Sequence, residues 1–178
     1  KMESMMRVGR WEKEILKTLG VGILLLGSLV MPGLPIILTP FIKRRGAKGF
    51  KKVVNRLEEK GVVYLSGQKI KLTSRGKKLL EEIEIKEIEI RHPHKWDKIW
   101  RLASYDVPEK FKKERDWFRS NLRRLGFKQI QKSLWVIPYE CKEEIAALAH
   151  YLRISPYVIV MQTDFLPQHE QLKKYFNL

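Results

Sequence analysis

Residues 47–60 read AKGFKKVVNRLEEK, and this stretch decides the fold of the first half of the chain. Its apolar residues recur at the spacing of one face of an α-helix, at Phe50, Val53, Val54 and Leu57. The opposite face carries four cations and an amide, namely Lys48, Lys51, Lys52, Arg56 and Asn55. Gly61 follows, as is typical of a helix C-terminus. The pattern predicts a helix from Ala47 to Lys60 with a buried apolar side and a basic outer side.

The segments after this helix predict a β-hairpin and a further helix. Two short alternating runs, Val62–Leu65 and Lys69–Leu72, flank the tripeptide Ser-Gly-Gln, which is typical of a hairpin turn. Thr73 or Ser74 is a suitable N-cap for a helix from Arg75 to about Ile88.

The segments before it predict one long and one short helix. The first runs from Arg10 to Met31, and a short helical turn follows from Leu34 to Lys43, limited by Pro40. The order of helix, short helix, basic helix, hairpin and helix is that of a winged helix, a variant of the helix-turn-helix family.

The net charge of the chain indicates a polyanionic partner. The 178 residues include 36 Lys and Arg against 20 Asp and Glu, which gives a formal net charge of +16. Thirteen of the cations lie between Lys43 and Lys78, where Glu58 and Glu59 are the only acids. This excess points to nucleic acid or an anionic membrane surface. A single cysteine excludes an intramolecular disulfide framework and a cysteine-rich zinc site, and we expect a cytoplasmic protein.

The uncharged segment Leu19–Phe41 raises the alternative of a membrane-associated protein. Pro32 and Pro35 interrupt it, and the apolar piece before Pro32 is shorter than the roughly 20 residues that a helix needs to span a bilayer. We therefore expect a buried core helix here, with membrane association as the minor reading.

The second half of the chain predicts a different domain. His92-Pro93-His94 breaks the preceding pattern, so we expect one domain over residues 1–90 and a second over 91–178. The second half predicts strand, helix, strand, helix and strand, at Lys98–Val107, Pro108–Leu125, Lys128–Ile137, Lys142–Leu152 and Tyr157–Thr163. This order matches part of the ferredoxin-like βαββαβ pattern, with one strand either near Pro138–Cys141 or missing. The predicted fold class is α+β, a winged helix followed by a ferredoxin-like domain.

The basic helix and the hairpin give the predicted DNA-binding residues. In helix-turn-helix proteins one helix enters the major groove, with polar groups toward base edges and cations toward phosphates. The side-chain amide of Asn55 can form two hydrogen bonds with the major-groove edge of an adenine. The residues expected to contact duplex DNA are Arg44, Arg45, Lys48, Lys51, Lys52, Asn55, Arg56, Lys69 and Lys71. The alternative is a solvated outer helix face with no partner.

Asp106 is the one candidate for a metal-dependent activity. It follows a predicted strand and precedes Pro108, where a carboxylate can hold a divalent cation that activates water. One carboxylate holds Mg²⁺ poorly, so this reading needs a second copy of Asp106 from a two-fold-related subunit and a Mg²⁺ ion at the dimer interface. Asp164 is the other acid at a strand end, and the sequence does not pair the two. The alternative role for Asp106 is a cap or dipole partner of the following helix.

Several segments of the second half carry a family resemblance. These are WDKIWRL at 96–102, YDVPE at 105–109, Leu122 to Gly126-Phe127, and QKSLWV at 131–136. Together they resemble the central domain of PaaX-like transcriptional repressors, which is similar to the small CRISPR-associated protein that scaffolds the spacer integrase. The resemblance covers about residues 96–164, and the basic helix and hairpin fit the winged helix that precedes this domain in PaaX-like proteins.

The resemblance implies a ferredoxin-like domain that dimerises through its sheet, with winged helices that bind operator DNA. In the CRISPR relatives the aspartate after the first strand holds a metal between two subunits, and Asp106 matches that position. The function predicted is therefore a homodimeric DNA-binding transcriptional regulator, a repressor. The alternatives are a Mg²⁺-dependent nuclease or CRISPR-adaptation protein acting through Asp106, and a membrane-surface protein using residues 19–41.

Overall fold

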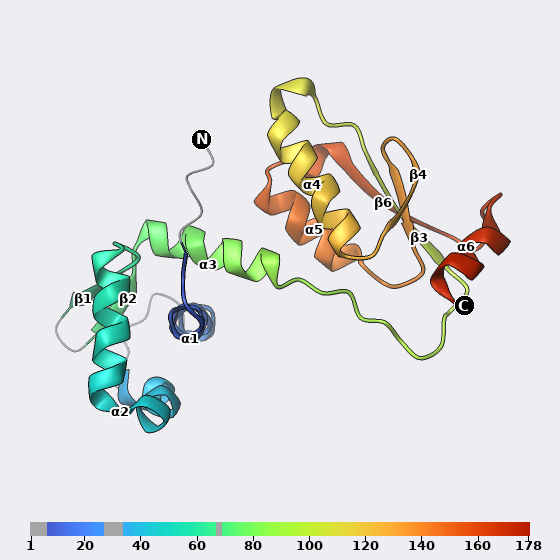
Figure 1. The fold of residues 1–178 in the computed structure, drawn as a ribbon. Coiled ribbons are helices and arrows are strands. Elements are labelled where there is room, and N and C mark those ends of the chain that lie inside the picture. Colours follow the sequence, from blue (N-terminus) through green and yellow to red (C-terminus); the bar gives the residue numbers. More distant parts are fainter. Residues whose placement is uncertain (1–6, 27–33, 67–68) are drawn as a thin grey trace. The chain divides into compact units, whose positions relative to one another are not determined.

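The structure is a computed structural model that describes residues 7–26, 34–66 and 69–178. The chain divides into two compact units, unit 1 from Lys1 to Lys86 and unit 2 from Glu87 to Leu178 (Figure 1). Both units combine helices with strands, so the predicted α+β class is confirmed.

In unit 1 the described elements follow the predicted order. They are α1 (Arg10–Leu26), α2 (Leu34–Glu59), β1 (Val63–Ser66), β2 (Lys69–Leu72) and α3 (Ser74–Lys86). The predicted end of the first helix at Met31 lies outside the described residues. Helix α2 is broken at Gly46, whose φ of 72° and ψ of 161° are not helical. The break separates the predicted short helix from the predicted basic helix, which occupies residues 47–59.

One apolar core holds the elements of unit 1 together. The basic helix contributes its predicted face, with Val53, Val54 and Leu57 buried and Phe50 partly buried against them. Helices α1 and α3 and the hairpin supply the remaining buried residues, which are Ile15, Leu16, Val62, Val63, Leu72, Leu79, Leu80 and Ile83. The side of α2 that faces away from this core is thereby fixed.

The ends of the basic helix and of α3 have the caps that the sequence predicts. Gly61 has a φ of 65° and donates its N–H to the carbonyl oxygen of Glu58 at 2.7 Å, which ends α2. The Thr73 hydroxyl oxygen accepts the N–H of Gly76 at 3.0 Å and so caps the first turn of α3. The backbone N–H of Thr73 also donates to Val62, at the start of the hairpin.

Unit 2 has the complete ferredoxin-like order of elements. The described elements are β3 (Trp100–Tyr105), the 3₁₀-helix η1 (Glu109–Phe111), α4 (Lys112–Arg124), β4 (Lys128–Gln131), β5 (Leu134–Ile137), α5 (Lys142–Tyr151), the 3₁₀-helix η2 (Ser155–Tyr157), β6 (Val158–Thr163) and α6 (His169–Phe176). The strands form one antiparallel sheet in the order β4-β5-β3-β6. With α4 and α5 between the strands, this is the βαββαβ pattern.

The prediction of a single strand over Lys128–Ile137 is wrong. This segment forms two strands, β4 and β5, which pair with each other across a turn at Lys132 and Ser133. The one strand of the ferredoxin-like pattern that the sequence did not locate therefore lies inside this segment, and not near Pro138–Cys141. The turn contains no glycine, proline or asparagine, so the usual hairpin signal is absent.

Different helices cover the two faces of the sheet. Figure 1 shows α4 and α5 side by side against it. Tyr105 meets Phe118 of α4 with ring centroids 5.5 Å apart, which places α4 on the Tyr105 face. On the opposite face Trp100, Leu102 and Val136 pack against Leu172 of α6.

Strand β6 leaves part of that opposite face uncovered. Met161 pairs with Leu102 and Ile159 pairs with Ser104 across the β3–β6 ladder, so both side chains point to the α6 side of the sheet. They are nevertheless 42% and 60% exposed. Strand β6 is also an edge strand, since β3 is its one neighbour in the sheet. Unit 2 thus presents apolar side chains next to an unpaired strand edge.

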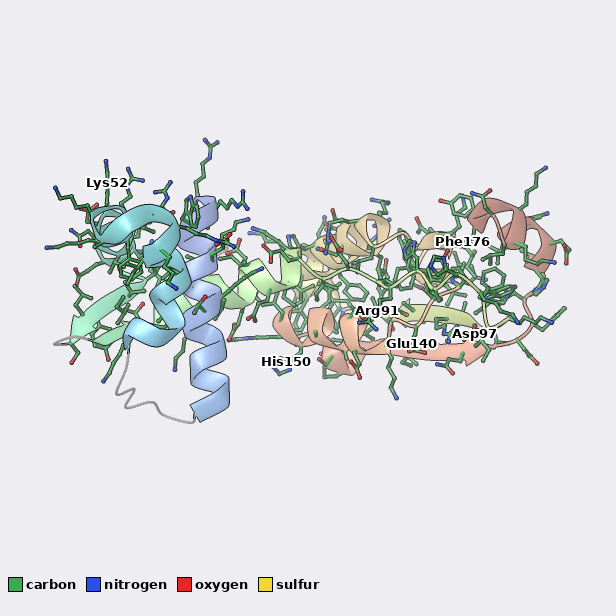
Figure 2. The ribbon with its side chains drawn as sticks, turned by 90° about the horizontal axis from the view of Figure 1, so that it is seen from below. Lys52, Arg91, Asp97, Glu140, His150 and Phe176 are labelled. Atoms are coloured by element: carbon green, nitrogen blue, oxygen red, sulfur yellow. The ribbon has the colours of Figure 1, made fainter. Side chains whose placement is uncertain are left out.

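A buried arginine ties the start of β3 to the end of β5. Arg101 is 5% exposed and makes a two-pronged contact with Asp97, from Nη1 to Oδ1 at 2.8 Å and from Nη2 to Oδ2 at 2.6 Å. Its Nη1 also donates to the carbonyl oxygen of Pro138 at 3.0 Å, and its Nη2 donates to Glu140 at 3.3 Å. Figure 2 labels both carboxylates of this network, Asp97 and Glu140.

The network shifts the titration of both carboxylates. The hydrogen bond from Arg101 lowers the pKa of Asp97 below its ordinary value of 3.8, against an opposing effect of burial. For Glu140, burial raises the pKa, but the N–H groups of Lys142 and Cys141 and the charge of Arg101 together lower it below its ordinary value of 4.5. Both carboxylates are therefore better stabilised as anions in the folded protein than in the unfolded chain.

None of the helices within the described ranges has both the length and the apolar character needed to cross a membrane. Residues 27–33 of the uncharged segment lie outside those ranges.

Replacing Gly76 with alanine should destabilise unit 1. A Cβ atom at Gly76 would lie 1.9 Å from the carbonyl oxygen of Val62, which is backbone and cannot swing away. Alanine in a helix normally gains up to about 1 kcal/mol over glycine, but the clash should reverse the sign and cost about 1–3 kcal/mol. Urea unfolding followed by circular dichroism measures this, with Lys77→Ala as the control on an exposed neighbour. A Gly76→Ala protein more stable than the wild type would contradict the close packing.

The Arg101 network should make the stability of unit 2 depend on acidic pH. Because both carboxylates have lowered pKa values when folded, their contribution is complete above about pH 5 and is lost as the pH falls through those folded values. Asp97→Asn should lower stability at pH 7 and make the loss of stability between pH 5 and 3 less steep. Tryptophan fluorescence reports mainly on this unit, which holds four of the five tryptophans, Trp96, Trp100, Trp117 and Trp135. The control is Asp164→Asn at an exposed aspartate. If the free energy of unfolding falls equally steeply with decreasing pH in Asp97→Asn and in the wild type, the effect is excluded.

Candidate nucleic-acid interface

The exposed side of α2 carries most of the predicted DNA-binding residues. Because Val53, Val54 and Leu57 face the core, the positions between them face solvent. Figure 2 shows Lys52 projecting outward from this helix among other side chains that end in nitrogen. The exposed residues of the predicted set on α2 are Arg44, Arg45, Lys48, Lys51, Lys52, Asn55 and Arg56. They are called the basic face below.

The break at Gly46 positions the cations at the start of the basic face. A φ of 72° is readily adopted by glycine and disfavoured for other residues, and a Cβ at this position would meet no atom within 4 Å. The conformation, and not the space, therefore requires glycine. Arg44 and Arg45 lie directly before this break and Lys48 lies in the first turn after it.

The cations of the basic face have no acidic partner among the residues that the structure describes. In the described part of the chain, none of the six forms an ion pair with a carboxylate. Lys60, which directly follows the same helix, differs because its Nζ lies 2.7 Å from the carboxylate of Glu12. A face with six exposed cations and no acid partners binds an external polyanion more readily than a face of paired charges.

Arg45 is held in place by an aromatic ring. Its guanidinium carbon lies 4.9 Å from the centroid of the Trp11 ring, in the range of a cation–π contact. Trp11 itself packs against the core of unit 1. The sequence pattern did not single out Trp11, because the contact joins residues far apart in the chain and no local spacing indicates it.

The hairpin contributes one predicted residue that the structure describes fully. Lys71 is exposed on β2 and pairs across the ladder with Tyr64, which is also exposed. The backbone of Lys69 lies in β2, but its side chain and residues 67–68 are outside the described residues. The sequence reading missed the apolar side chains of this hairpin, since Tyr64 and Leu65 of β1 are 44% and 45% exposed.

Asp106 is exposed directly after β3, as the sequence predicts. Its backbone N–H donates to the carbonyl oxygen of Tyr157 at 3.0 Å. The following helix η1 begins after Pro108 and has no side-chain cap, so of the alternative roles for Asp106 the cap is wrong, and the dipole partner stays a prediction. Among the described residues there is no group of three His, Cys, Asp or Glu side chains that could hold a metal ion. A Mg²⁺ ion shared between two copies of Asp106 stays a prediction.

The single cysteine does not have the properties of a nucleophile. Cys141 is completely buried at the start of α5. Burial, with a further contribution from the charges of Glu140 and Glu144, raises the pKa of its thiol to about 12. A thiol with this pKa stays protonated at neutral pH and is unreactive.

A comparison with known protein families gives a match. Residues 93–175 match the family described as the PaaX protein central Cas2-like domain. No curated protein matches the chain. The matched segment begins shortly before β3 and ends within α6, so it contains the whole four-stranded sheet of unit 2 and none of the basic face. Residues 93–175 are therefore similar to the PaaX central Cas2-like domain, which confirms the PaaX-like resemblance predicted from the sequence.

Proposed function

We propose that the protein is a homodimeric transcriptional regulator, acting as a repressor in the cytoplasm, and that it binds duplex DNA through the basic face of α2. The observation that carries this proposal is the set of six exposed cations on one side of a helix whose other side is buried. Such a face can neutralise several phosphates at once, and phosphate neutralisation supplies most of the affinity of proteins for DNA.

The arrangement of unit 1 supports docking as a winged helix. In this arrangement the basic helix lies in the major groove and the hairpin lies beside it as the wing. The helix from residue 47 to 59 is preceded by a shorter helix and followed by the β1–β2 hairpin. Lys71 would then contact the backbone next to the groove, and Asn55 would face base edges from the middle of the helix.

The family of unit 2 supports a regulatory role. PaaX-like proteins, which residues 93–175 resemble, combine this domain with a DNA-binding winged helix, and unit 1 precedes the matched segment in the same order. The repressor role rests on this resemblance.

The uncovered side of β6 supports a homodimer. Ile159 and Met161 are apolar and exposed next to a strand edge that has no partner in the described chain. Such surfaces are usually covered in soluble proteins. A second copy seated on this side would bury both side chains and present two basic faces, suited to two half-sites spaced by about one helical turn, ~34 Å, or a multiple.

The proposal predicts strongly salt-dependent binding to duplex DNA. If each subunit neutralises several phosphates, affinity should fall about 1000-fold or more between 50 and 200 mM salt. Fluorescence anisotropy with a labelled duplex pool, followed by selection of bound sequences, measures both affinity and motif. Weak binding whose affinity does not change over this salt range would exclude the proposed function.

Two substitutions on the basic face separate backbone from base contacts. Lys52→Ala should weaken all duplexes alike and reduce the salt slope by about one per subunit. Asn55→Ala should leave the slope unchanged and reduce the preference for the selected sequence by about 1–3 kcal/mol. The control is Lys113→Ala, at an exposed lysine of α4. Equal effects of both substitutions on sequence preference would contradict these roles.

The dimer is tested by placing a charge on β6. Ile159→Glu should convert the dimer to a folded monomer, because an unpaired carboxylate would be buried at the proposed interface. Light scattering after size-exclusion chromatography measures the mass. Leu65→Glu, which changes an exposed apolar residue of the hairpin in unit 1, is the matched control and should remain dimeric. A wild-type protein that is monomeric at micromolar concentration would contradict the homodimer.

A further inference from the structure

A hollow of about 540 Å³ lies in unit 1 between the start of α1 and the basic helix of α2. Two segments line it, residues 7–12 and one side of α2. Five cations are among the lining residues, namely Arg7, Arg10, Arg45, Arg56 and Lys60. Arg7 and Arg10 are not part of the basic face, so the hollow extends the positive charge from α2 to the beginning of α1.

Glu12 is the one carboxylate among the described residues that line the hollow, and its two oxygens already accept hydrogen bonds from within the protein. It is 6% exposed, and its carboxylate accepts the N–H of Gly9 at 2.7 Å and both contacts from the Lys60 ammonium at 2.7 and 2.8 Å. The Lys60 ammonium donates its remaining bond to the carbonyl oxygen of Arg7 at 3.0 Å. These two charges cancel each other and join α1 to α2. They leave the hollow with a positive charge that comes from arginines alone.

The arginines are available to an incoming anion. Arg45 and Arg56 form no ion pair within the described residues, and the same holds for Arg7. Arg10 lies 3.5 Å from Glu14 on the outside of α1, but its side chain is 83% exposed, and such surface pairs contribute little. The guanidinium group donates through two parallel N–H groups, a geometry that matches the oxygens of a phosphate.

Trp11 prepares one of these arginines for binding. The Arg45 guanidinium lies over the Trp11 ring at 4.9 Å, and Trp11 also lines the hollow. This contact restricts the positions that the guanidinium can take. Less side-chain freedom is then lost when the guanidinium binds an oxyanion.

We propose that this hollow holds a backbone phosphate of the bound DNA, outside the stretch of backbone that the rest of the basic face contacts. Arg45 and Arg56 belong both to the basic face and to the hollow, so a duplex lying along α2 passes the mouth of the hollow. Arg7 and Arg10 approach the phosphate from the α1 side, and Trp11 is a positioning residue for Arg45. The inference rests on the proposed function, because it needs a duplex bound to α2.

The test compares the double variant Arg7→Ala/Arg10→Ala with the wild type in a phosphate ethylation interference experiment on the selected duplex. In the wild type, ethylation at one phosphate flanking the contacted groove should block binding, and in the double variant, which keeps Arg45 and Arg56, the same ethylation should have a clearly smaller effect. The salt slope should fall by about one per subunit, and binding at 100 mM salt should weaken about tenfold. Arg91→Ala, at an exposed arginine of unit 2 shown in Figure 2, removes the same kind of charge outside the hollow and should leave the interference pattern unchanged.

Arg45→Lys tests the guanidinium contact with the phosphate without changing the net charge. It should weaken binding and reduce interference at the same phosphate, because an ammonium cannot make the two-pronged contact. Trp11→Phe should have a smaller effect in the same direction, with circular dichroism confirming that unit 1 is folded. An interference pattern identical in the wild type and the double variant would overturn the inference and leave the proposed function intact. A wild-type protein without duplex binding would overturn both.

Discussion

Burial of one apolar stripe on α2 is the constraint on which the remaining features of unit 1 depend. Val53, Val54 and Leu57 are nearly inaccessible, so rotation of the helix about its axis would expose them. Their burial fixes the outward direction of Lys48, Lys51, Lys52 and Asn55. It also brings one side of α2 next to the start of α1, where Lys60 meets Glu12 and Arg45 meets Trp11. The arrangement of the charges is thus a consequence of hydrophobic packing.

The two units differ in the kind of surface that they expose, and this difference suits them to different partners. In unit 1 the exposed surface of α2 is basic and lacks acid partners within the described residues. In unit 2 the buried Arg101 is neutralised by Asp97 and Glu140, and the surface that remains to be covered is apolar. A surface of unpaired cations suits a polyanion, and an apolar strand edge suits a second protein chain. The proposed regulator uses each for the partner that its chemistry favours.

Local signals in the sequence were sufficient where a single residue decides the backbone. The positive φ values of Gly61 and Gly126 end α2 and α4 where the sequence predicts, and Thr73 caps α3. The β4–β5 turn was missed because Lys132 and Ser133 carry no turn signal. The contacts of Trp11 with Arg45, of Arg101 with Glu140 and of Glu12 with Lys60 could not be predicted, because they join residues far apart in the chain and depend on packing that no periodicity encodes. The basic face was predictable because amphipathic spacing and charge are both local properties.

The crowding of like charges on α2 has a consequence for the free protein. Six cations within thirteen residues, from Arg44 to Arg56, repel one another as long as no polyanion is bound. Dissolved salt screens this repulsion and so strengthens the unbound fold, while the same salt weakens the attraction to phosphates. Ionic strength therefore acts on folding and on association in opposite directions. The conditions that best preserve the purified protein are the ones in which its hold on a polyanion is weakest.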